Sequence, residues 1–404
     1  MKVALLLSNS CFEGFLGSVQ GQTRDSYLRR YRNDWSWYYA RGLLENGIKP
    51  VIYIPALREA GAYETDAGVS VRFLPLSPWC RPLEWFWVKR LARRTRWTLY
   101  LDQRLNVMAF MKPLRQGLAE DKIDLLYVQE HWSGRFDHLA RRLDLPVAGA
   151  DHGGVAFGTF RLFKRAAFQR AATCYGQTKD ECRLIRDHGG RAELLPNGCD
   201  VEAFSPDPRI VRRKVILTVA RLTNKQKRTS DLIRALAKLP EDWRLEIVGR
   251  GPDRAMLERL ARDLGVAERV HFHGFLGRDE IRGLLRRCGV YAMPSSNEAV
   301  ALAVLEAMAC GAAVVLSRIR AFEALVEDGV NGCLTPVGDV DALAAGIERA
   351  WANHAALGQA AVERIREHYD SRRLYAKLAA SLADSVRRHG RLAAGPAEAA
   401  GEPA

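Results

Sequence analysis

Residues 294–311 read PSSNEAVALAVLEAMACG, and Glu298 and Glu306 stand eight positions apart in this stretch. An apolar run rich in strand-forming residues precedes it and stops at Pro294. From 301 to 310 the chain is rich in Ala, Leu and Met, which predicts a buried helix, and a second apolar run follows. The pattern therefore predicts a strand–helix–strand unit with one carboxylate on the loop and the other inside an apolar helix.

A carboxylate in apolar surroundings is costly unless it has hydrogen-bond donors. Glu306 therefore needs hydroxyl or amide partners, and the hydroxyls of a ribose are suitable donors. The helix start between the two glutamates offers free backbone N–H groups and the positive end of a helix dipole, which suits a phosphate. Two carboxylates that flank a phosphate site indicate a pocket for a nucleotide sugar.

Two glutamates at this spacing are common, and taken alone they are best explained by a turn cap and a contact with a neighbouring helix. The whole stretch, however, resembles the donor site of retaining glycosyltransferases of family 4, whose GT-B fold has two facing Rossmann-like domains. The resemblance implies that Glu298 lies beside the donor sugar and that Glu306 holds the ribose; we assign Leu302 to the donor-binding residues as well. The family usually has glycine where this chain has Ala299 and Ala301, so a loop that needs a positive φ would be strained there.

The composition fits a folded protein with two domains. A chain of 404 residues is long for one core, and its hydrophobic fraction of 48% and charged fraction of 27% are those of a globular protein. The formal net charge of +14 admits nucleic acid, anionic lipid and phosphorylated substrates as partners, and charge alone does not choose among them.

The cysteines and the apolar runs predict a cytoplasmic protein. The eight cysteines form no C-x-x-C pair and several lie in apolar runs, which favours reduced, packed thiols over disulfides or a zinc site. Residues 1–8 favour a first parallel strand over a signal peptide, and no apolar run is long enough to span a membrane.

Strands and helices alternate regularly from residue 214 onward, which predicts a parallel, doubly wound sheet. Its strands are expected at 215–219, 245–248, 270–275, 290–293, 313–316 and 332–335. The N-terminal half alternates less evenly but has a similar architecture, with strands expected at 3–7, 51–54, 71–74, 125–128 and 147–148. We predict an α/β protein with the GT-B fold and a donor/acceptor cleft between two Rossmann-like, doubly wound domains. The N-terminal acceptor-binding domain covers 1–205, the C-terminal nucleotide-sugar-binding domain with the terminal helices covers 206–390, and 391–404 form a disordered tail.

Basic residues follow the first strand of the C-terminal half. Arg221 comes just after the strand, and two lysines, Lys225 and Lys227, precede the next helix. As isolated residues they would be solvated surface, but cations at the carboxyl ends of parallel strands lie where such sheets bind ligands. The resemblance implies that Arg221 and one lysine grip the donor diphosphate without a metal or other cofactor. Lys227 is preferred by its distance from the following helix, and Lys225 remains an alternative.

Three further groups are assigned through the resemblance. The turn with Gly249 and Gly251 lies beside the donor nucleotide, although a plain tight turn explains it equally well. His273 lies on the strand near the base. His152 follows a strand and precedes two glycines; a lone histidine is more often structural, but the family commonly has one here that approaches the donor sugar and the acceptor.

The loop after the first strand departs most from the family. A short Gly-Gly turn against the donor phosphates is usual, whereas this chain has a longer segment in which Gly14 or Gly17 would fill the same role. The added residues are expected to shape the acceptor site.

Residues 79–97 contain four tryptophans among six arginines and lysines. As a helix they would be amphipathic and basic, which suits an anionic bilayer surface, while a helix packed on its own sheet with solvated arginines is the alternative. The resemblance implies that the N-terminal domain receives the acceptor. We therefore expect a lipid-linked or cell-envelope glycan acceptor and peripheral attachment to the inner face of the cytoplasmic membrane.

Taken together, the sequence predicts a retaining glycosyltransferase that moves a sugar from a nucleotide diphosphate sugar to an acceptor hydroxyl. A nucleotide-sugar epimerase on the same fold is the alternative, and it would convert the donor without an acceptor. A basic nucleic-acid-binding protein would explain the charge but leaves Glu298 and Glu306 without a role, so we expect no nucleic-acid partner.

Overall fold

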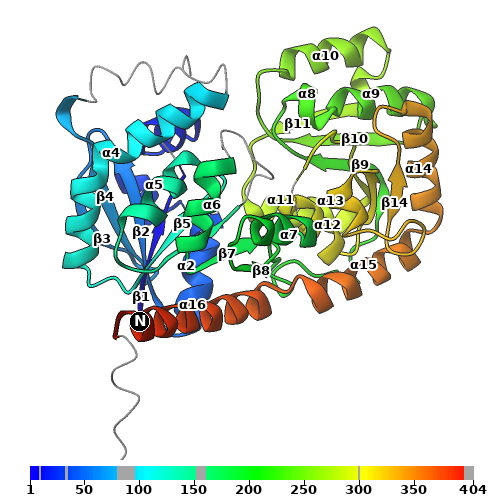
Figure 1. Cartoon of the computed structure of the whole chain (residues 1–404). Coiled ribbons are helices and arrows are strands. Elements are labelled where there is room, and N and C mark those ends of the chain that lie inside the picture. The colour runs from blue at the N-terminus through cyan, green and yellow to red at the C-terminus, as the bar shows by residue number, and fades with distance from the viewer. Residues whose placement is uncertain (9–10, 32–34, 80–95, 152–160, 299–300, 395–404) are drawn as a thin grey trace, which may run out of the picture. The chain divides into compact units, whose positions relative to one another are not determined.

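The computed structural model describes the chain except residues 9–10, 32–34, 80–95, 152–160, 299–300 and 395–404. It divides the chain into two compact units (Figure 1): unit 1 contains Met1–Leu195 and Tyr375–Ala404, and unit 2 contains Pro196–Leu374. Each unit is built on its own sheet.

The sheet of unit 1 has the order β3-β4-β2-β1-β5-β6-β7-β8, in which all neighbours are parallel except β3 with β4. The strands are β1 (Lys2–Leu6), β2 (Lys49–Ala56), β3 (Gly61–Glu64), β4 (Ser70–Pro75), β5 (Leu125–Gln129), β6 (Val147–Ala150), β7 (Thr173–Gly176) and β8 (Ala192–Leu194). The chain leaves the central strand β1 in both directions, toward β2 and toward β5. The carboxyl ends of β1 and β5 therefore mark the point where the strand order reverses.

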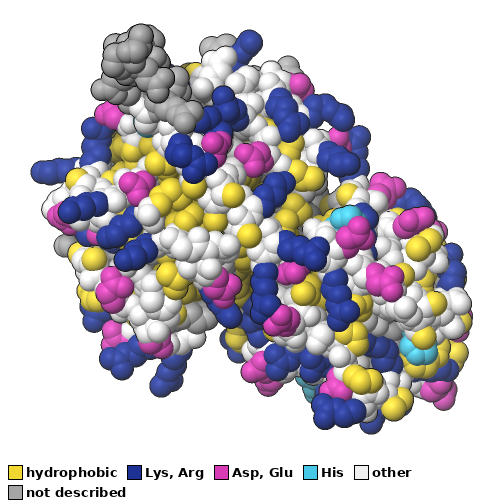
Figure 2. All heavy atoms as spheres, turned by 90° about the horizontal axis from the view of Figure 1, so that it is seen from below, with side chains coloured by type: hydrophobic (Ala, Val, Ile, Leu, Met, Phe, Trp, Pro, Cys, Tyr) yellow, Lys and Arg dark blue, Asp and Glu magenta, His cyan; other side chains and the backbone are white. Residues whose placement is uncertain are grey.

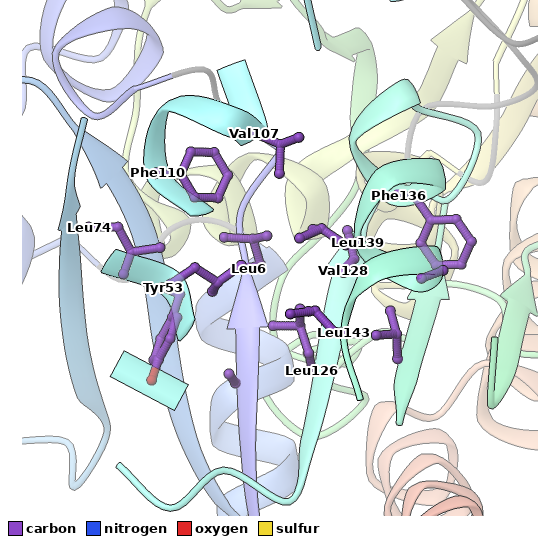
Figure 3. Packing of buried hydrophobic residues seen from close by; sticks show 14 of the residues in the cluster. Leu6, Tyr53, Leu74, Val107, Phe110, Leu126, Val128, Phe136, Leu139 and Leu143 are labelled. Carbon is purple, nitrogen blue, oxygen red and sulfur yellow. The ribbon is translucent and has the colours of Figure 1, made fainter. Parts of the chain in front are cut away.

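Helices cover both faces of this sheet. They are η1 (Glu13–Val19), α1 (Arg24–Arg29), α2 (Trp35–Glu45), α4 (Arg96–Glu120), α5 (Gly134–Arg142), α6 (Arg161–Arg170), α7 (Lys179–Asp187) and α16 (Ser371–Ala394). Helices α4, α5 and α6 pack on one face, where Val107 and Phe110 of α4 point toward Leu6 of the central strand (Figure 3). On the other face Tyr39 of α2 contacts both Tyr127 and Tyr375.

Unit 2 has a six-stranded, fully parallel sheet of order β11-β10-β9-β12-β13-β14. The strands are β9 (Arg213–Val219), β10 (Arg244–Val248), β11 (Val270–Gly274), β12 (Cys288–Met293), β13 (Ala313–Ser317) and β14 (Cys333–Thr335). Numbered within the unit, this order is 3-2-1-4-5-6, the order of dinucleotide-binding sheets, in which ligands bind beyond the carboxyl ends where the order reverses. In unit 2 that point lies between β9 and β12.

Two layers of helices bury the central strands of unit 2, which explains why those strands are continuous apolar runs. Helices α9, α10 and α14 cover one face, and α11, α12 and α15 cover the other. The helices of the unit are α8 (Asn224–Lys227), α9 (Thr229–Lys238), α10 (Arg254–Asp263), the short η4 (Ala267–Arg269), α11 (Arg278–Arg287), α12 (Leu302–Ala309), α13 (Arg320–Glu323), α14 (Val340–Ala352) and α15 (His354–His368).

The predicted fold class is confirmed: both units are Rossmann-like, with parallel sheets between helices. In unit 2 each of the six strands lies where the alternation predicted it. In unit 1 the pattern missed β3, β7 and β8, which have only three or four residues each and are too short to show a period.

The division of the chain falls after Leu195, ten residues before the predicted boundary at 205. The backbone of Cys199 explains this difference, because its N–H donates to Tyr369 O at 2.7 Å and its carbonyl accepts from Ser371 N at 2.9 Å. Residues after Leu195 are therefore bound to the last helices of unit 2. From Tyr375 onward, α16 belongs to unit 1 instead of the predicted C-terminal domain.

The contacts of α16 explain that assignment. Gly42 of α2 lies directly under Tyr375, so that a Cβ there would come within 2.2 Å of the tyrosine ring. Farther along the helix, Ser381 shares hydrogen bonds with Tyr175 and Glu193. The helix continues to Ala394, into the segment predicted to be a disordered tail, and residues 395–404 lie outside the described residues.

Two expectations from the composition, on the cysteines and on membrane-spanning helices, can be compared with the structure. The seven cysteines that the structure describes are buried, in agreement with packed thiols. Among the helices in the described part of the chain, none is both long enough and apolar enough to cross a lipid bilayer.

Two glycines let the loops after β9 and β10 touch. Gly249 has a φ of +139°, and a Cβ on it would lie 1.9 Å from Ala220 O. A Cβ on Gly251 would lie 2.3 Å from Leu222 O. The N–H of Leu222 donates to Arg250 O at 3.0 Å across this contact. The glycines are therefore required by close backbone packing beside the reversal point.

We predict that Gly249→Ala lowers the free energy of unfolding by about 3 kcal/mol or more, because alanine meets both a strained φ and a backbone oxygen. Gly283 lies inside α11 with open space around it, so Gly283→Ala is the control and should be neutral or stabilise by about 0.5–1 kcal/mol. Urea unfolding measures both. Equal effects of the two substitutions would refute the role given to Gly249.

Candidate active site

The loops after β9 and β12 are joined at the reversal point of unit 2. Gln226 of α8 donates from its side-chain amide to Asn297 O at 3.0 Å, and its own carbonyl accepts from Ser296 N at 2.9 Å. The Ser317 hydroxyl, at the end of β13, donates to Ser295 O. These bonds hold the loop that carries Glu298 against the helix that carries Lys227.

Lys227 and Glu298 form an ion pair with 2.5 Å between Nζ and Oε1. Only 12% of the lysine side chain and 8% of the glutamate side chain are exposed. A short, largely desolvated pair of this kind is stronger than a surface ion pair, although each charge has lost most of its hydration. The reversal point therefore holds a fixed cation and a fixed carboxylate in direct contact.

The two lysines between which the sequence left a choice differ in their surroundings. Lys227 contacts Glu298, whereas Lys225 is exposed. Arg221 lies two residues beyond β9 and is exposed. The structure thus brings Lys227 and Glu298 together, and it places Arg221 at the same edge of the sheet with its side chain in solvent.

Glu306 lies inside α12 and contacts Arg278, whose Nη2 is 3.3 Å from Oε1. Only 15% of the glutamate side chain is exposed, among the buried residues of the surrounding core. This burial raises the pKa of Glu306 to about 7, and the positive charge of Arg278 opposes the rise. The carboxyl group is therefore partly protonated near neutral pH.

Arg278 is a site residue that the sequence reasoning missed. It is the first residue of α11, and its guanidinium lies 4.9 Å from the centre of the Phe204 ring. A signal in the sequence could have found it: Arg278 is a basic residue that follows the carboxyl end of a strand, as Arg221 is. What the sequence could not give is its contact with Glu306, 28 residues farther along.

Tyr291 of β12 is a buried phenol at the reversal point. Its hydroxyl donates to Val219 O at 3.4 Å, at the end of β9. Burial raises the pKa of Tyr291 well above its usual value, and the nearby charges of Glu298 and Glu306 add to the rise. The charges of Glu298 and Glu306 thus both act on one buried phenol.

The start of α12 has no side-chain cap. Ala301 is its N-cap, with a φ of −72° and no side chain that could accept a hydrogen bond from the first turn. The strain expected from alanine in place of glycine is therefore absent at Ala301, while Ala299 lies outside the described residues. Leu302 is the first helical residue and is half-buried, so its backbone belongs to the end that carries the positive dipole.

The remaining predicted residues of unit 2 lie at the same edge or beside it. Gly249 and Gly251 form the loop after β10, packed against the loop that carries Arg221. His273 lies on the edge strand β11, and its Nε2 is 3.0 Å from Oε2 of Glu246 on β10. His273 therefore has a protein partner on the neighbouring strand.

In unit 1, Gly14 and Gly17 lie on η1, the helical turn after β1. Glu13 fixes this turn to the end of β2, because its carboxylate accepts from Leu57 N at 2.9 Å and from Arg58 N at 2.7 Å. A Cβ on either glycine would find ordinary van der Waals distances, so neither position requires glycine sterically. His152 lies outside the described residues.

The reversal point of unit 1 has a feature that the sequence did not indicate. Glu130, just after β5, has a φ of +58°, a costly conformation for a residue with a side chain. The end of β1, the strand that pairs with β5, is held by buried Arg135. This arginine donates to Leu7 O and to Asn106 Oδ1, both at 2.6 Å. Such strain is found preferentially at functional loops.

Comparison with known proteins identifies the family. Residues 200–368 match the family described as Glycosyl transferases group 1. The D-inositol 3-phosphate glycosyltransferase of Nocardiopsis dassonvillei is 31% identical over 358 residues, which cover 77% of this chain and 79% of that protein. The chain therefore belongs to this family of glycosyltransferases.

Two further proteins are similar over different extents. A GDP-mannose-dependent alpha-(1-6)-phosphatidylinositol monomannoside mannosyltransferase of Mycolicibacterium smegmatis is 36% identical over 37% of this chain, and the match spans less than half, 44%, of that relative. The structure of HepE from Anabaena in complex with UDP is 19% identical and covers 95% of this chain and 100% of its own, with a TM-score of 0.69. That likeness shows that the fold is GT-B.

We predict that wild type loses stability relative to Glu306→Gln as the pH rises from 4.5 to 7. The folded state holds the Glu306 proton more tightly than the unfolded chain does, so ionisation in this window favours unfolding. At roughly 1.4 kcal/mol per pKa unit the relative loss is about 3 kcal/mol. Urea unfolding of both proteins across this range measures it. The exposed Glu348→Gln is the control, and its free energy of unfolding should differ from that of wild type by the same amount at every pH. If the difference for Glu306→Gln were also independent of pH, the buried environment of Glu306 would be contradicted.

Proposed function

We propose that the protein is a retaining glycosyltransferase of family 4 that transfers a sugar from a nucleotide diphosphate sugar to a hydroxyl group. The observation that carries this proposal is the Lys227–Glu298 pair, with Glu306 nearby, at the reversal point of a dinucleotide-type sheet. The anomeric configuration of the product, read by NMR, tests whether the configuration is retained.

In the proposed site the donor diphosphate lies at the start of α12. The N–H groups of Leu302 and Ala303 donate no hydrogen bond to the side chain of the N-cap, so phosphate oxygens would accept from them. Lys227 is fixed at this edge and Arg221 is free to turn toward the ligand. The two cations would stabilise the negative charge that develops on the leaving diphosphate, and we propose that the reaction needs no metal ion.

The two carboxylates would bind the sugars of the donor. Glu298, oriented by Lys227, would accept hydrogen bonds from the transferred sugar. Glu306 would accept from the ribose hydroxyls, which supply the donors that a buried carboxylate requires. Arg278 would keep Glu306 partly ionised until the ribose binds.

The acceptor is proposed to be a lipid-linked or cell-envelope glycan. The relative from Mycolicibacterium smegmatis is named for a GDP-mannose donor and a phosphatidylinositol mannoside acceptor, and HepE was solved with UDP. These names support a nucleotide sugar as the donor and a membrane glycan as the acceptor class. With such an acceptor we propose that the enzyme works as a peripheral protein on the cytoplasmic face of the membrane.

We expect one nucleoside diphosphate among UDP, GDP and ADP to raise the melting temperature of wild type in the presence of EDTA. At about 100 times Kd, binding adds about 2.7 kcal/mol to the free energy of unfolding. Glu306→Ala should lose most of this gain because the ribose loses its acceptor. A failure of all three nucleotides to stabilise wild type would count against the donor site, and a gain that appears only without EDTA would count against metal independence.

We expect Arg221→Ala to lower kcat by about tenfold to a thousandfold with a small change in the donor KM, because its charge acts mainly on the leaving group. Glu306→Ala should mainly raise the donor KM. The control is Arg262→Ala, which removes an exposed arginine from the last turn of α10. Steady-state kinetics of sugar transfer separate the two constants, and unchanged constants in either site variant would defeat that residue's role.

A further inference from the structure

Helix α4 of unit 1 has two different faces. Its inner face carries Val107, Phe110, Leu114 and Leu118, which are buried in the core of the unit. Figure 3 shows Val107 and Phe110 directed toward Leu6 of the central strand. This packing fixes the rotation of the helix, so the residues on the opposite side have a defined orientation.

The outer face of α4 is apolar where a soluble helix would carry charges. Leu101, Leu105 and Met108 have 53%, 49% and 56% of their surface exposed, and they follow the i, i+4, i+7 spacing of a single stripe. Scattered exposed apolar residues are ordinary, but three large ones in one stripe form a patch. We call this stripe, together with exposed Lys112 and Arg115, the α4 outer face.

The charge around this stripe is net positive. Lys112 and Arg115 continue the stripe toward the end of the helix, and Asp102 is turned inward, with 8% of its surface exposed. Helix α4 contains four arginines and lysines against two acidic residues, and the second of these, Glu120, pairs with Arg72. On the face drawn in Figure 2, by contrast, Lys and Arg are mixed with Asp and Glu. A partner of the α4 outer face must therefore be anionic.

The combination of aliphatic and basic side chains favours a bilayer among anionic partners. Leu and Met enter the boundary between headgroups and acyl chains, while Lys and Arg reach the lipid phosphates. Nucleic acid would be bound by basic and stacking aromatic groups, and it gives no environment for an aliphatic stripe. Trp79, at the other end of the connection that leads into α4, is 54% exposed and is a residue type enriched at membrane interfaces.

We propose that the α4 outer face, with Trp79, docks the protein on the surface of an anionic lipid bilayer. This inference rests on the peripheral membrane attachment proposed above and names the surface that makes it. The surface lies on unit 1, whereas the proposed donor-binding residues lie on unit 2. It also differs from the sequence prediction for residues 79–97, of which 80–95 lie outside the described residues. The proposal stands on α4 and Trp79 alone.

The test is co-sedimentation of the full-length protein with vesicles of phosphatidylcholine, with and without phosphatidylglycerol, at low and high salt. Wild type should bind the phosphatidylglycerol vesicles and be released partly by salt. The triple variant Leu101→Ser, Leu105→Ser, Met108→Ser should bind about tenfold more weakly or worse, since three half-exposed apolar side chains no longer enter the lipid. Lys112→Glu with Arg115→Glu should weaken binding and reduce its dependence on salt.

A matched control removes exposed apolar residues from unit 2. Val211→Ser, Val330→Ser and Val337→Ser change side chains that are 80%, 50% and 41% exposed, and vesicle binding should be unchanged. Thermal unfolding checks that each variant folds. Vesicle binding uses no donor nucleotide, so its outcome is independent of the proposed reaction.

Three results would overturn the proposal. The first is that wild type ignores phosphatidylglycerol vesicles at low salt. The second is that the α4 triple variant binds them as wild type does. The third is that the triple variant instead abolishes self-association or binding to duplex RNA in light-scattering and filter-binding controls, which would assign the face to a second copy of the chain or to nucleic acid.

Discussion

The parallel pairing of β9 with both β10 and β12 is the constraint on which the site depends. Because the chain leaves β9 in one direction and returns on its other side at β12, the loops after these two strands emerge side by side. One loop leads into the helix that carries Lys227, and the other carries Glu298. No local feature of either loop creates their contact; the order of the strands does.

This arrangement places charged side chains where they are largely removed from water, which costs free energy. A desolvated lysine–glutamate pair and a buried glutamate with a raised pKa cost free energy that an apolar core would not. A ligand rich in hydroxyls and phosphates offsets that cost, since it supplies donors to the carboxylates and negative charge to the cations. The nucleotide sugar proposed as donor carries both kinds of group, as expected for a glycosyltransferase of the GT-B fold.

Much of the site of unit 2 could be predicted, because its residues lie beside elements with a strong pattern. Glu298 follows a buried strand and Glu306 interrupts an apolar helix, and both facts are visible locally. The choice between Lys225 and Lys227 was left open because it depends on a contact between positions 71 residues apart. Arg278 was missed for the same reason. The strained Glu130 was missed because, apart from glycine, the type of a residue does not predict a positive φ.

The sequence by itself determined the fold class, the six strands of unit 2 and the residue types of the candidate site, because hydrophobic period and turn residues are local properties of the chain. Only the tertiary structure decided where the units divide, which side chain meets which, and which face of α4 is turned outward. Backbone bonds of Cys199 to Tyr369 and Ser371, and the packing of Tyr375 on Gly42, join segments far apart in the chain. Such pairings follow from how the layers pack, and a pattern of neighbouring residues does not encode them.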